Sequence, residues 1–217
     1  MQHRNGLPAL VGFVGSTGAG KTTLAELLVQ RMGFARFHMG QPIKQMLLGL
    51  GLELSDVTSS IRERPHSLLG GRSPRYAMQT LGTNWGRQMI SPDIWCLAVE
   101  RLVSAHRARE EASPVVIDDL RFPNDWQMCE RLGGVIVRLM RPGSAPEAPS
   151  WIDHAANRYA ALRVAAMALG ARPLHATEYH WYRAPAQLEV INEGDIEVTF
   201  ARLVSGLEQL SASERNG

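Results

Sequence analysis

Short apolar runs alternate with amphipathic stretches along this chain. The run Ala9-Leu-Val-Gly-Phe-Val14 is apolar and is followed by a glycine, which is typical of a buried parallel strand. From Lys21 to Met32, leucines and a methionine recur at helical spacing. The pattern therefore predicts an opening unit of strand, glycine-rich loop and helix.

The same alternation continues to residue 140 and predicts an α/β fold, with helices around a parallel sheet. Residues 51–72 are polar and irregular, which favours a loop on the substrate side. The remaining predicted elements are an extended piece at 34–39, helices at 42–50, 76–88, 93–107 and 125–132, and strands at 114–118 and 135–140.

Prolines and glycines cluster after Arg141, and an alanine-rich helix is predicted at 154–169. We interpret residues 141–183 as an insertion within a single domain of residues 1–217. The chain then returns to the sheet with a strand at Leu188–Ile191 and closes with an amphipathic helix. The polar tail after Leu210 is expected to fray.

Composition limits the function classes. With 217 residues and 45% hydrophobic content, the chain is long enough for one substantial core. Its 23 basic and 21 acidic residues nearly cancel, so broad binding to a nucleic-acid polymer or a membrane is not expected. Cys96 and Cys129 lack metal-binding spacing, which indicates buried thiols in a reducing compartment. No signal peptide or spanning segment is evident, so we expect a soluble, cytoplasmic protein.

A phosphate-binding loop is the strongest motif. Its pattern is G-x-x-x-x-G-K-[ST], with a predicted strand before it and a helix after it. Backbone N–H groups and the helix dipole suit an ATP triphosphate, Lys21 can bridge the β- and γ-phosphates, Thr22 is the candidate Mg²⁺ ligand, and Thr23 can reach the α-phosphate. The matching residues are Gly15, Ser16, Thr17, Gly18, Ala19, Gly20, Lys21 and Thr22. A glycine-rich turn that binds nothing explains neither Lys21 nor the flanking elements.

The predicted strand at 114–118 ends in two carboxylates, Asp118 and Asp119. In α/β folds this position carries metal-binding or water-orienting groups. Adjacent residues of an extended chain point to opposite sides, so only one aspartate is expected to face the phosphates. Helix capping is the alternative role. Arg121 follows, and its planar fork suits an acceptor phosphate, with a surface arginine as the alternative.

A second cluster runs from Arg75 to Trp95. Arg75 and Gln79 lie four apart on one predicted helical face, with hydroxyl, basic and aromatic groups behind them. Such a set can hold a phosphate, a base edge and a stacking face. Taken singly, Trp85 and Trp95 are equally well explained as core residues. No Asn-Lys-x-Asp guanine motif occurs, which favours a small-molecule kinase over a GTPase.

These stretches resemble, in family order and across nearly the whole chain, the deoxynucleoside monophosphate kinases of bacteriophage type, relatives of adenylate kinase and dephospho-coenzyme A kinase. The glutamine-x-leucine-glycine-threonine element followed by aspartate-x-arginine is the specific part. The matching stretches are Gly15–Thr23, Gln41–Lys44, Arg75–Trp95, Asp119–Pro123, Val137–Gly143, His175–Glu178 and Val190–Gly194.

The resemblance implies a five-stranded parallel core, a mobile lid within 141–183, an acceptor-binding part at about residues 40–95, and ATP with Mg²⁺. It places Arg141 near the transferring phosphate, Asn192 and Gly194 near adenine, and His175 and Glu178 in the lid. The predicted catalytic residues are Lys21, Asp119 and Arg141. The family register and the strand alternation together predict that Asp119→Asn harms turnover more than Asp118→Asn. At Asp125 the family often has glutamate. The implied acceptor contacts are Lys44, Arg75, Gln79, Gly82, Thr83, Arg87, Trp95, Asp119, Arg121 and Asp125.

The predicted function is in-line transfer of the ATP γ-phosphoryl group to a deoxynucleoside monophosphate, without a covalent intermediate. The alternatives are a P-loop kinase of another small molecule, such as a coenzyme precursor, and a non-enzymatic nucleotide-binding switch. A metal site in the loop that carries His175, Glu178 and His180 is disfavoured. Zinc sites normally have three or four protein ligands, and the loop does not offer a convincing set of three. Base preference, ribose discrimination and oligomeric state, a homodimer included, stay open.

Overall fold

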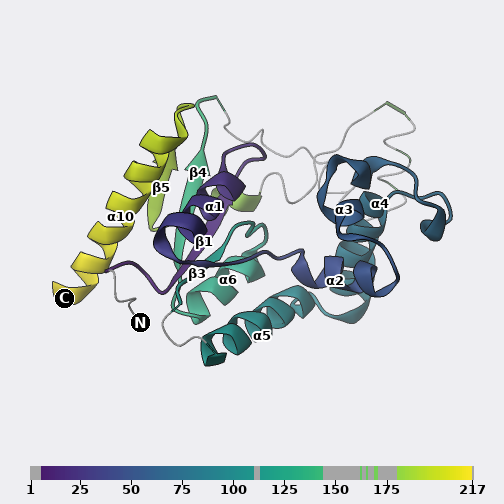
Figure 1. The fold of residues 1–217 in the computed structure, drawn as a ribbon, viewed down its shortest axis with the longest axis horizontal. Helices are drawn as coiled ribbons and strands as arrows, with labels where there is room; N and C mark the ends of the chain where they lie inside the picture. The colour runs from purple at the N-terminus through teal and green to yellow at the C-terminus, as the bar shows by residue number, and fades with distance from the viewer. Residues whose placement is uncertain are drawn as a thin grey trace. The chain divides into compact units, whose positions relative to one another are not determined.

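The computed structural model describes residues 6–109, 113–143, 162, 165, 169–170 and 180–216. Its internal contacts divide the chain into two compact units (Figure 1). Unit 1 comprises Met1–Arg36 with Glu111–Gly217, and unit 2 comprises Phe37–Glu110. Most of the helix predicted at 154–169 lies outside the described residues, as do His175 and Glu178. Within the described part, no helix combines the length and apolar character needed to cross a bilayer.

A five-stranded sheet forms the centre of unit 1, in the order β2-β3-β1-β4-β5. β1 pairs in parallel with both β3 and β4, and Val11 lies opposite Val116 on one side and Val135 on the other. The predicted parallel α/β sheet is confirmed. The strands are β1 Leu10–Gly15, β2 Ala35–Phe37, β3 Val115–Ile117, β4 Val135–Met140 and β5 Leu188–Ile191.

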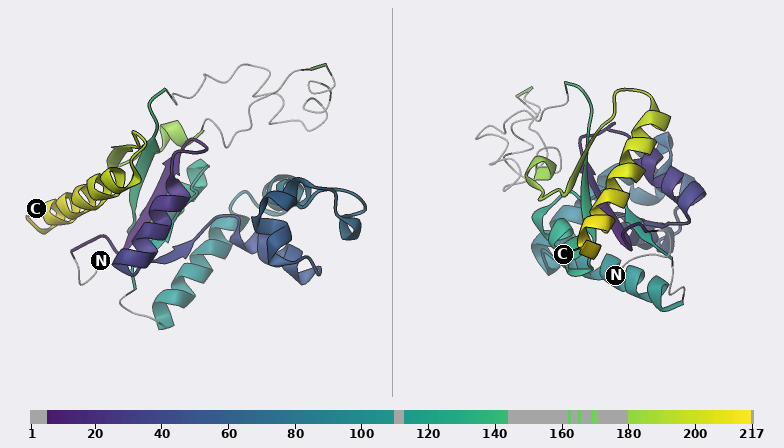
Figure 2. Two further views of the ribbon diagram at one scale, coloured as in Figure 1. Left: turned by 45° about the horizontal axis from the view of Figure 1, so that its top comes forward. Right: turned by 90° about the vertical axis from the view of Figure 1, so that its left-hand side faces the viewer.

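The helices of unit 1 pack an apolar stripe against this sheet. Leu24 and Leu28 of α1 share one buried cluster with Phe13 of β1 and with Leu203 and Leu207 of α10. Figure 2 shows α10 running along β5, with which it is in contact. The elements are α1 Lys21–Met32, α6 Pro123–Arg131, the 3₁₀ turn η4 His180–Arg183 and α10 Ile196–Asn216.

The expected fraying after Leu210 is wrong, because α10 continues to Asn216. Leu203, Leu207 and Ser211 are at most 1% exposed and lie four residues apart. This spacing keeps one stripe of the helix buried past Leu210, and burial rather than local propensity sets where a helix ends.

Parallel pairing brings the carboxyl ends of the strands to one edge of the sheet. The loop at residues 15–20 follows β1, Asp118 and Asp119 follow β3, Arg141 follows β4, and Asn192 follows β5. Open α/β sheets bind ligands at this edge. The fold of unit 1 therefore gathers predicted site residues from four separate stretches of sequence.

Unit 2 is helical. The segment 51–72, predicted to be irregular, contains α3 and two 3₁₀ turns, because Leu52 and Val57 are buried against Leu47 and fold the segment back. These elements are too short to show helical periodicity in the sequence. The elements are α2 Gln41–Gly49, α3 Leu54–Thr58, η1 Ser60–Glu63, η2 Ser67–Leu69, α4 Pro74–Gln79, the π-helix η3 Thr80–Ile90 and α5 Ile94–Arg109.

The helix predicted at 76–88 is α-helical only as far as Gln79 and then widens into a π-helix. Trp95 packs against the widened segment. Its indole N–H donates to the Gly82 carbonyl over 2.8 Å, and a Cβ at Gly86 would lie 2.4 Å from its ring. Ser91 N–H bonds to the Gly86 carbonyl at the i+5 spacing of a π-helix. π-Helical turns are rare and frequently lie at functional sites.

Candidate functional site

The phosphate loop lies between β1 and α1, as the motif predicted. Lys21 begins α1, and its Nζ donates to the carbonyl oxygens of Gly15 and Ser16 over 2.9 and 2.7 Å. Within the described residues, the buried Ser16 hydroxyl has no hydrogen-bond partner. A buried donor without a partner is costly, and an oxygen of a bound phosphate would satisfy it. The loop therefore fits a polyphosphate.

The Lys21 ammonium is held at a lowered pKa. Burial is the main cause, the positive charge of Arg121 adds to it, and Asp119 and Asp118 oppose it, which leaves the pKa of Lys21 at about 8. Arg121 is therefore close enough to the loop to act on Lys21. A bound polyanion favours the charged lysine, so phosphate binding and lysine protonation are coupled.

This coupling predicts that ATP affinity falls as the pH rises through about 8. Above that pH the free enzyme loses the Lys21 charge, and binding must first restore the proton. Calorimetric titrations from about pH 7.5 to pH 9 are expected to show a roughly five- to tenfold loss of affinity. Lys21→Arg stays charged throughout, so its profile is expected to be flat. An equal loss of affinity in Lys21→Arg would show that another group titrates.

A carboxylate network lies beside the loop. The Thr22 hydroxyl donates to Asp118 Oδ2 over 3.5 Å, and Asp118 is only 3% exposed. Arg36 of β2 donates to the same oxygen from Nε over 2.9 Å and lies 2.6 Å from it through Nη2, while its Nη1 contacts Glu26 of α1 over 2.9 Å. Buried charges need such partners. The motif threonine therefore faces a fixed carboxylate.

The expectation that only one aspartate faces the phosphates stays a prediction. Both Asp118 and Asp119 raise the pKa of Lys21 through their charge, with Asp119 the stronger, and Asp118 also contacts Thr22. β3 ends at Ile117, so the strict alternation of a strand does not extend to the two aspartates. Sequence analysis missed Asp118 as the partner of Thr22. It also missed Arg36, which belongs to no motif. Arg36 lies on β2, and the position of this strand brings its side chain to Asp118.

Asp125, predicted as an acceptor contact, has a structural role instead. It is fully buried, and its Oδ2 accepts from the backbone N–H groups of Arg121 and Phe122 over 2.9 and 3.0 Å. This caps the start of α6 and fixes the turn that carries Arg121. The short aspartate side chain brings its carboxylate to these two N–H groups, which explains why an aspartate occupies this position. Arg141 is exposed immediately after β4.

Unit 2 carries the other predicted acceptor residues, along α4 and the π-helix. Arg75 and Gln79 are exposed, Thr83 and Arg87 are half-buried, and the four follow one another at intervals of four. Four residues overshoot a turn of an α-helix by about 40°. They fall short of a π-helical turn, about 4.4 residues, by about 30°. These two angular offsets have opposite signs. The change from α-helix to π-helix therefore keeps Arg75, Gln79, Thr83 and Arg87 in one row along the helix surface, called a stripe below.

Trp95 is not available as a stacking face. It is 2% exposed, and its indole N–H is occupied by Gly82, so the core alternative is the correct one for this residue. Gly82 itself is buried and supplies a carbonyl that also accepts from Arg87 over 3.4 Å. Lys44 is half-buried on α2. Trp95 and Gly82 thus shape the π-helix rather than present side chains on its surface.

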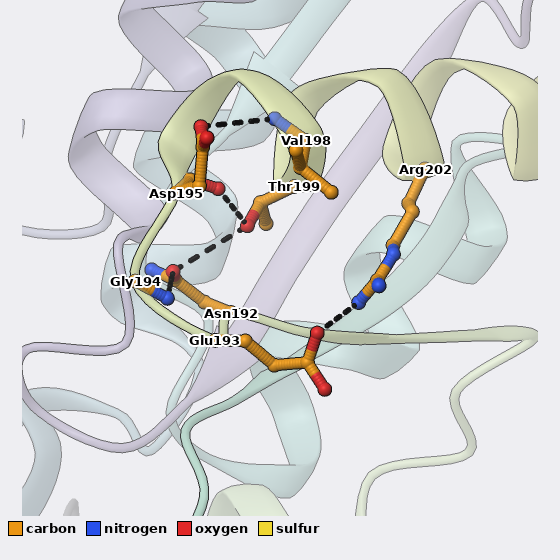
Figure 3. Close-up of polar contacts among 7 residues, drawn as sticks. All are labelled: Asn192, Glu193, Gly194, Asp195, Val198, Thr199 and Arg202. Carbon is orange, nitrogen blue, oxygen red and sulfur yellow. Dashed lines mark hydrogen bonds and ion pairs between the residues drawn. The ribbon is translucent and has the colours of Figure 1, made fainter.

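Asn192 and Gly194, predicted near adenine, lie in the turn between β5 and α10 (Figure 3). Gly194 is exposed, and Asn192 is 4% exposed with its side chain hydrogen-bonded inside unit 1. Among the described residues, no group of three or more His, Cys, Asp or Glu side chains is arranged to hold a metal ion.

A glycine loop between a strand and a helix, a lysine at the helix start, and a threonine facing a carboxylate that follows the neighbouring strand define a P-loop nucleotide-binding site. The fold agrees. Shikimate kinase from Aquifex aeolicus superposes with a TM-score of 0.51 at 13% identity, over 92% of this chain and 96% of that one. This likeness concerns the fold alone.

Two viral proteins are similar in sequence. A protein of Acanthamoeba polyphaga mimivirus, named as a deoxynucleotide monophosphate kinase, is 31% identical over 151 residues, which cover 64% of this chain and 77% of that protein. The deoxynucleoside-5'-monophosphate kinase of Escherichia phage T5 is 36% identical over 56 residues, 26% of this chain and 21% of that protein. No family model matches the chain. The chain belongs to the deoxynucleotide monophosphate kinases, and it is a nucleoside monophosphate kinase by class.

Proposed function

We propose that this kinase transfers the γ-phosphoryl group of ATP to a deoxynucleoside monophosphate and releases ADP and the diphosphate. The observation that carries the proposal is the arrangement at the end of β1 and β3. There a phosphate loop with an orphaned Ser16 hydroxyl lies beside Lys21, and Thr22 faces Asp118. The acceptor is taken from the names of the viral relatives.

On the ATP side, the loop N–H groups and Lys21 hold the phosphates. Magnesium fits the donors present, because Mg²⁺ prefers oxygen ligands and is commonly held by one or two protein groups together with substrate phosphates. The Thr22 hydroxyl and the Asp118 carboxylate, 3.5 Å apart, are the residues that would hold it. When bound, the ion supplies positive charge that neutralises the phosphate oxygens.

Transfer itself needs positioning and positive charge more than covalent chemistry. Lys21 supplies a charge at the γ-phosphoryl. The charge of Arg121 acts on Lys21, and Arg121 is proposed to hold the acceptor phosphate. Arg141, exposed at the end of β4, is proposed to join them, and Asp119 to orient the acceptor. The acceptor oxygen attacks the γ-phosphorus, and the bond to the ADP oxygen breaks.

We assign the acceptor nucleotide to unit 2, on the stripe formed by Arg75, Gln79, Thr83 and Arg87. Arg75 has an exposed guanidinium that pairs with Glu63 over 3.4 Å, a contact that a phosphate can replace. Gln79 offers both an amide donor and an acceptor to a base edge, and Thr83 offers a hydroxyl. This set recognises a phosphorylated, hydrogen-bonding ligand better than an apolar one.

Replacement of Arg75 by alanine is expected to raise the acceptor KM by roughly ten- to a hundredfold, since one charge-assisted contact is lost. Arg75→Lys should restore little, because an ammonium cannot reproduce the two-pronged geometry. Saturation curves for the monophosphate and for ATP measure the effect. Arg64→Ala removes the same charge from an exposed position of unit 2 and is the matched control. A change in the ATP curve alone would reassign Arg75 to the ATP side.

The proposed function is tested by coupled measurement of ADP release with each common deoxynucleoside and nucleoside monophosphate. We expect at least one deoxynucleoside monophosphate to stimulate ADP release strongly over the rate with ATP alone. Stimulation only by a different class of acceptor, such as a coenzyme precursor, would contradict the acceptor assignment. ATP binding with no stimulation by any acceptor would contradict the kinase assignment and favour a nucleotide-binding switch.

A further inference from the structure

The phosphate loop is held by Asn192, which follows the edge strand β5. The Asn192 side-chain amide donates from Nδ2 to the carbonyl oxygen of Ala19 over 3.1 Å, and both residues are buried. They are 173 positions apart in sequence. The Ala19 carbonyl is in the part of the loop that turns into α1. A fixed carbonyl there fixes the direction of the next N–H groups along the loop.

Asn192 is itself held by other groups, of which Figure 3 shows Gly194 and Thr199. Its Oδ1 accepts from the Gly194 N–H over 3.1 Å and lies 3.4 Å from the Thr199 hydroxyl oxygen. The backbone N–H of Asn192 donates to the Met140 carbonyl over 2.8 Å. The amide therefore has one donor directed at the loop and its oxygen directed at α10. A buried amide with partners on both ends has a single orientation.

The contact is also close enough to restrict the sequence of the loop. A Cβ built on Gly20 would lie 2.7 Å from Asn192 Nδ2, and Gly20 has a φ of +97°. Both the backbone conformation and the space taken by Asn192 therefore require glycine at this position. Asn192 therefore packs directly against the loop backbone at Gly20.

The start of α10 gives Asn192 a rigid support. Asp195 Oδ1 accepts from the N–H groups of Glu197 and Val198 over 2.9 and 3.2 Å, which caps the helix, and the Thr199 hydroxyl donates to the Asp195 carbonyl over 2.7 Å (Figure 3). Thr199 is buried. The turn from Asn192 to Thr199 is thus a hydrogen-bonded unit, and the Asn192 side-chain amide joins it to the phosphate loop.

We propose that Asn192 is a positioning residue for triphosphate binding: it holds the Ala19 carbonyl so that the loop N–H groups face the phosphates, and its side chain does not read the adenine base. This differs from the adenine contact expected for Asn192. It rests on the proposed function only in that the loop binds the triphosphate of ATP.

The two roles are separated by comparing two ligands that share phosphates but not a base. Binding of Mg-ATP and of magnesium tripolyphosphate is measured calorimetrically for wild type, Asn192→Ala and Asn192→Ser, which both keep the charge unchanged. Loss of one buried hydrogen bond is expected to weaken both ligands by about the same factor, roughly tenfold. Hydrogen exchange of the peptide containing residues 16–23, without ligand, is expected to become faster.

Two control variants use neighbouring positions. Thr199→Val removes a hydroxyl that supports Asn192 but leaves the Ala19 contact, so it is expected to lower the melting temperature with little change in tripolyphosphate binding. Glu193→Gln breaks only the exposed pair with Arg202, 2.8 Å long, and is expected to change neither.

Weaker ATP binding with unchanged tripolyphosphate binding in the Asn192 variants would overturn the proposal and restore the adenine contact. Unchanged binding of both ligands, or unchanged exchange at residues 16–23, would also overturn it. If wild type binds neither ligand, the proposed function fails, and the exchange measurement alone decides whether Asn192 anchors the loop.

Discussion

Lys21→Ala is expected to lower kcat by about 10²- to 10³-fold, the usual cost of removing a group that meets developing charge in a transition state. Lys21 is half-buried at the start of α1, and its Nζ lies on the loop at Gly15 and Ser16. Its charge is therefore fixed where the phosphates bind. The rate of phosphoryl transfer is measured at saturating ATP and acceptor, so that weaker binding does not contribute.

The fold of Lys21→Ala is checked by circular dichroism and melting temperature, because its ammonium also bonds to two loop carbonyls. Gln30→Ala is the control on the same helix, where Gln30 is exposed and remote from the loop in sequence. A folded Lys21→Ala variant that keeps most of its kcat would contradict the assignment of the loop.

Asp118→Asn is expected to lower kcat by about ten- to a hundredfold and to raise the Mg²⁺ concentration needed for half-maximal activity. The carboxylate faces the Thr22 hydroxyl and is held by Arg36, whereas an amide offers one neutral oxygen in the same space. Asp119→Asn is expected to lower kcat by a smaller factor than Asp118→Asn. This is the reverse of the order predicted from the sequence. The reason is that Asp118 is the carboxylate that contacts the Thr22 hydroxyl.

Magnesium titrations of the kinase rate compare the two variants. Glu26→Gln is the control, since Glu26 contacts Arg36 from an exposed position and is expected to leave the Mg²⁺ dependence unchanged. A larger rate loss or a larger Mg²⁺ shift in Asp119→Asn would restore Asp119 as the carboxylate on the metal side.

Local chemistry made the phosphate loop predictable. Glycines, Lys21 and Thr22 stand at fixed spacing between a strand and a helix, and each is required by the shape of a phosphate. The strands β4 and β5 were also predictable to the residue, because each is a short apolar run between turn signals. Motifs of this kind place the function within a few consecutive residues.

The remaining features depend on contacts that are distant in sequence. Arg36 reaches Asp118 because β2 lies beside β3. Neither the residue type of Arg36 nor its spacing in the sequence predicts this contact. Trp95 is a core residue that packs against Gly86 of the π-helix. Asp125 caps a turn, and a capping aspartate and a ligand-binding aspartate have the same sequence pattern.

Passage of the γ-phosphoryl group of ATP to a deoxynucleoside monophosphate can be followed directly. The enzyme is incubated with γ-labelled ATP, Mg²⁺ and each deoxynucleoside monophosphate in turn, and the label is followed by chromatography. We expect label in the β-position of a deoxynucleoside diphosphate, together with an equal amount of ADP, and a rate about 10²- to 10³-fold lower with Lys21→Ala. Label that appears only as inorganic phosphate, or that stays in ATP with every acceptor, would contradict the proposed transfer.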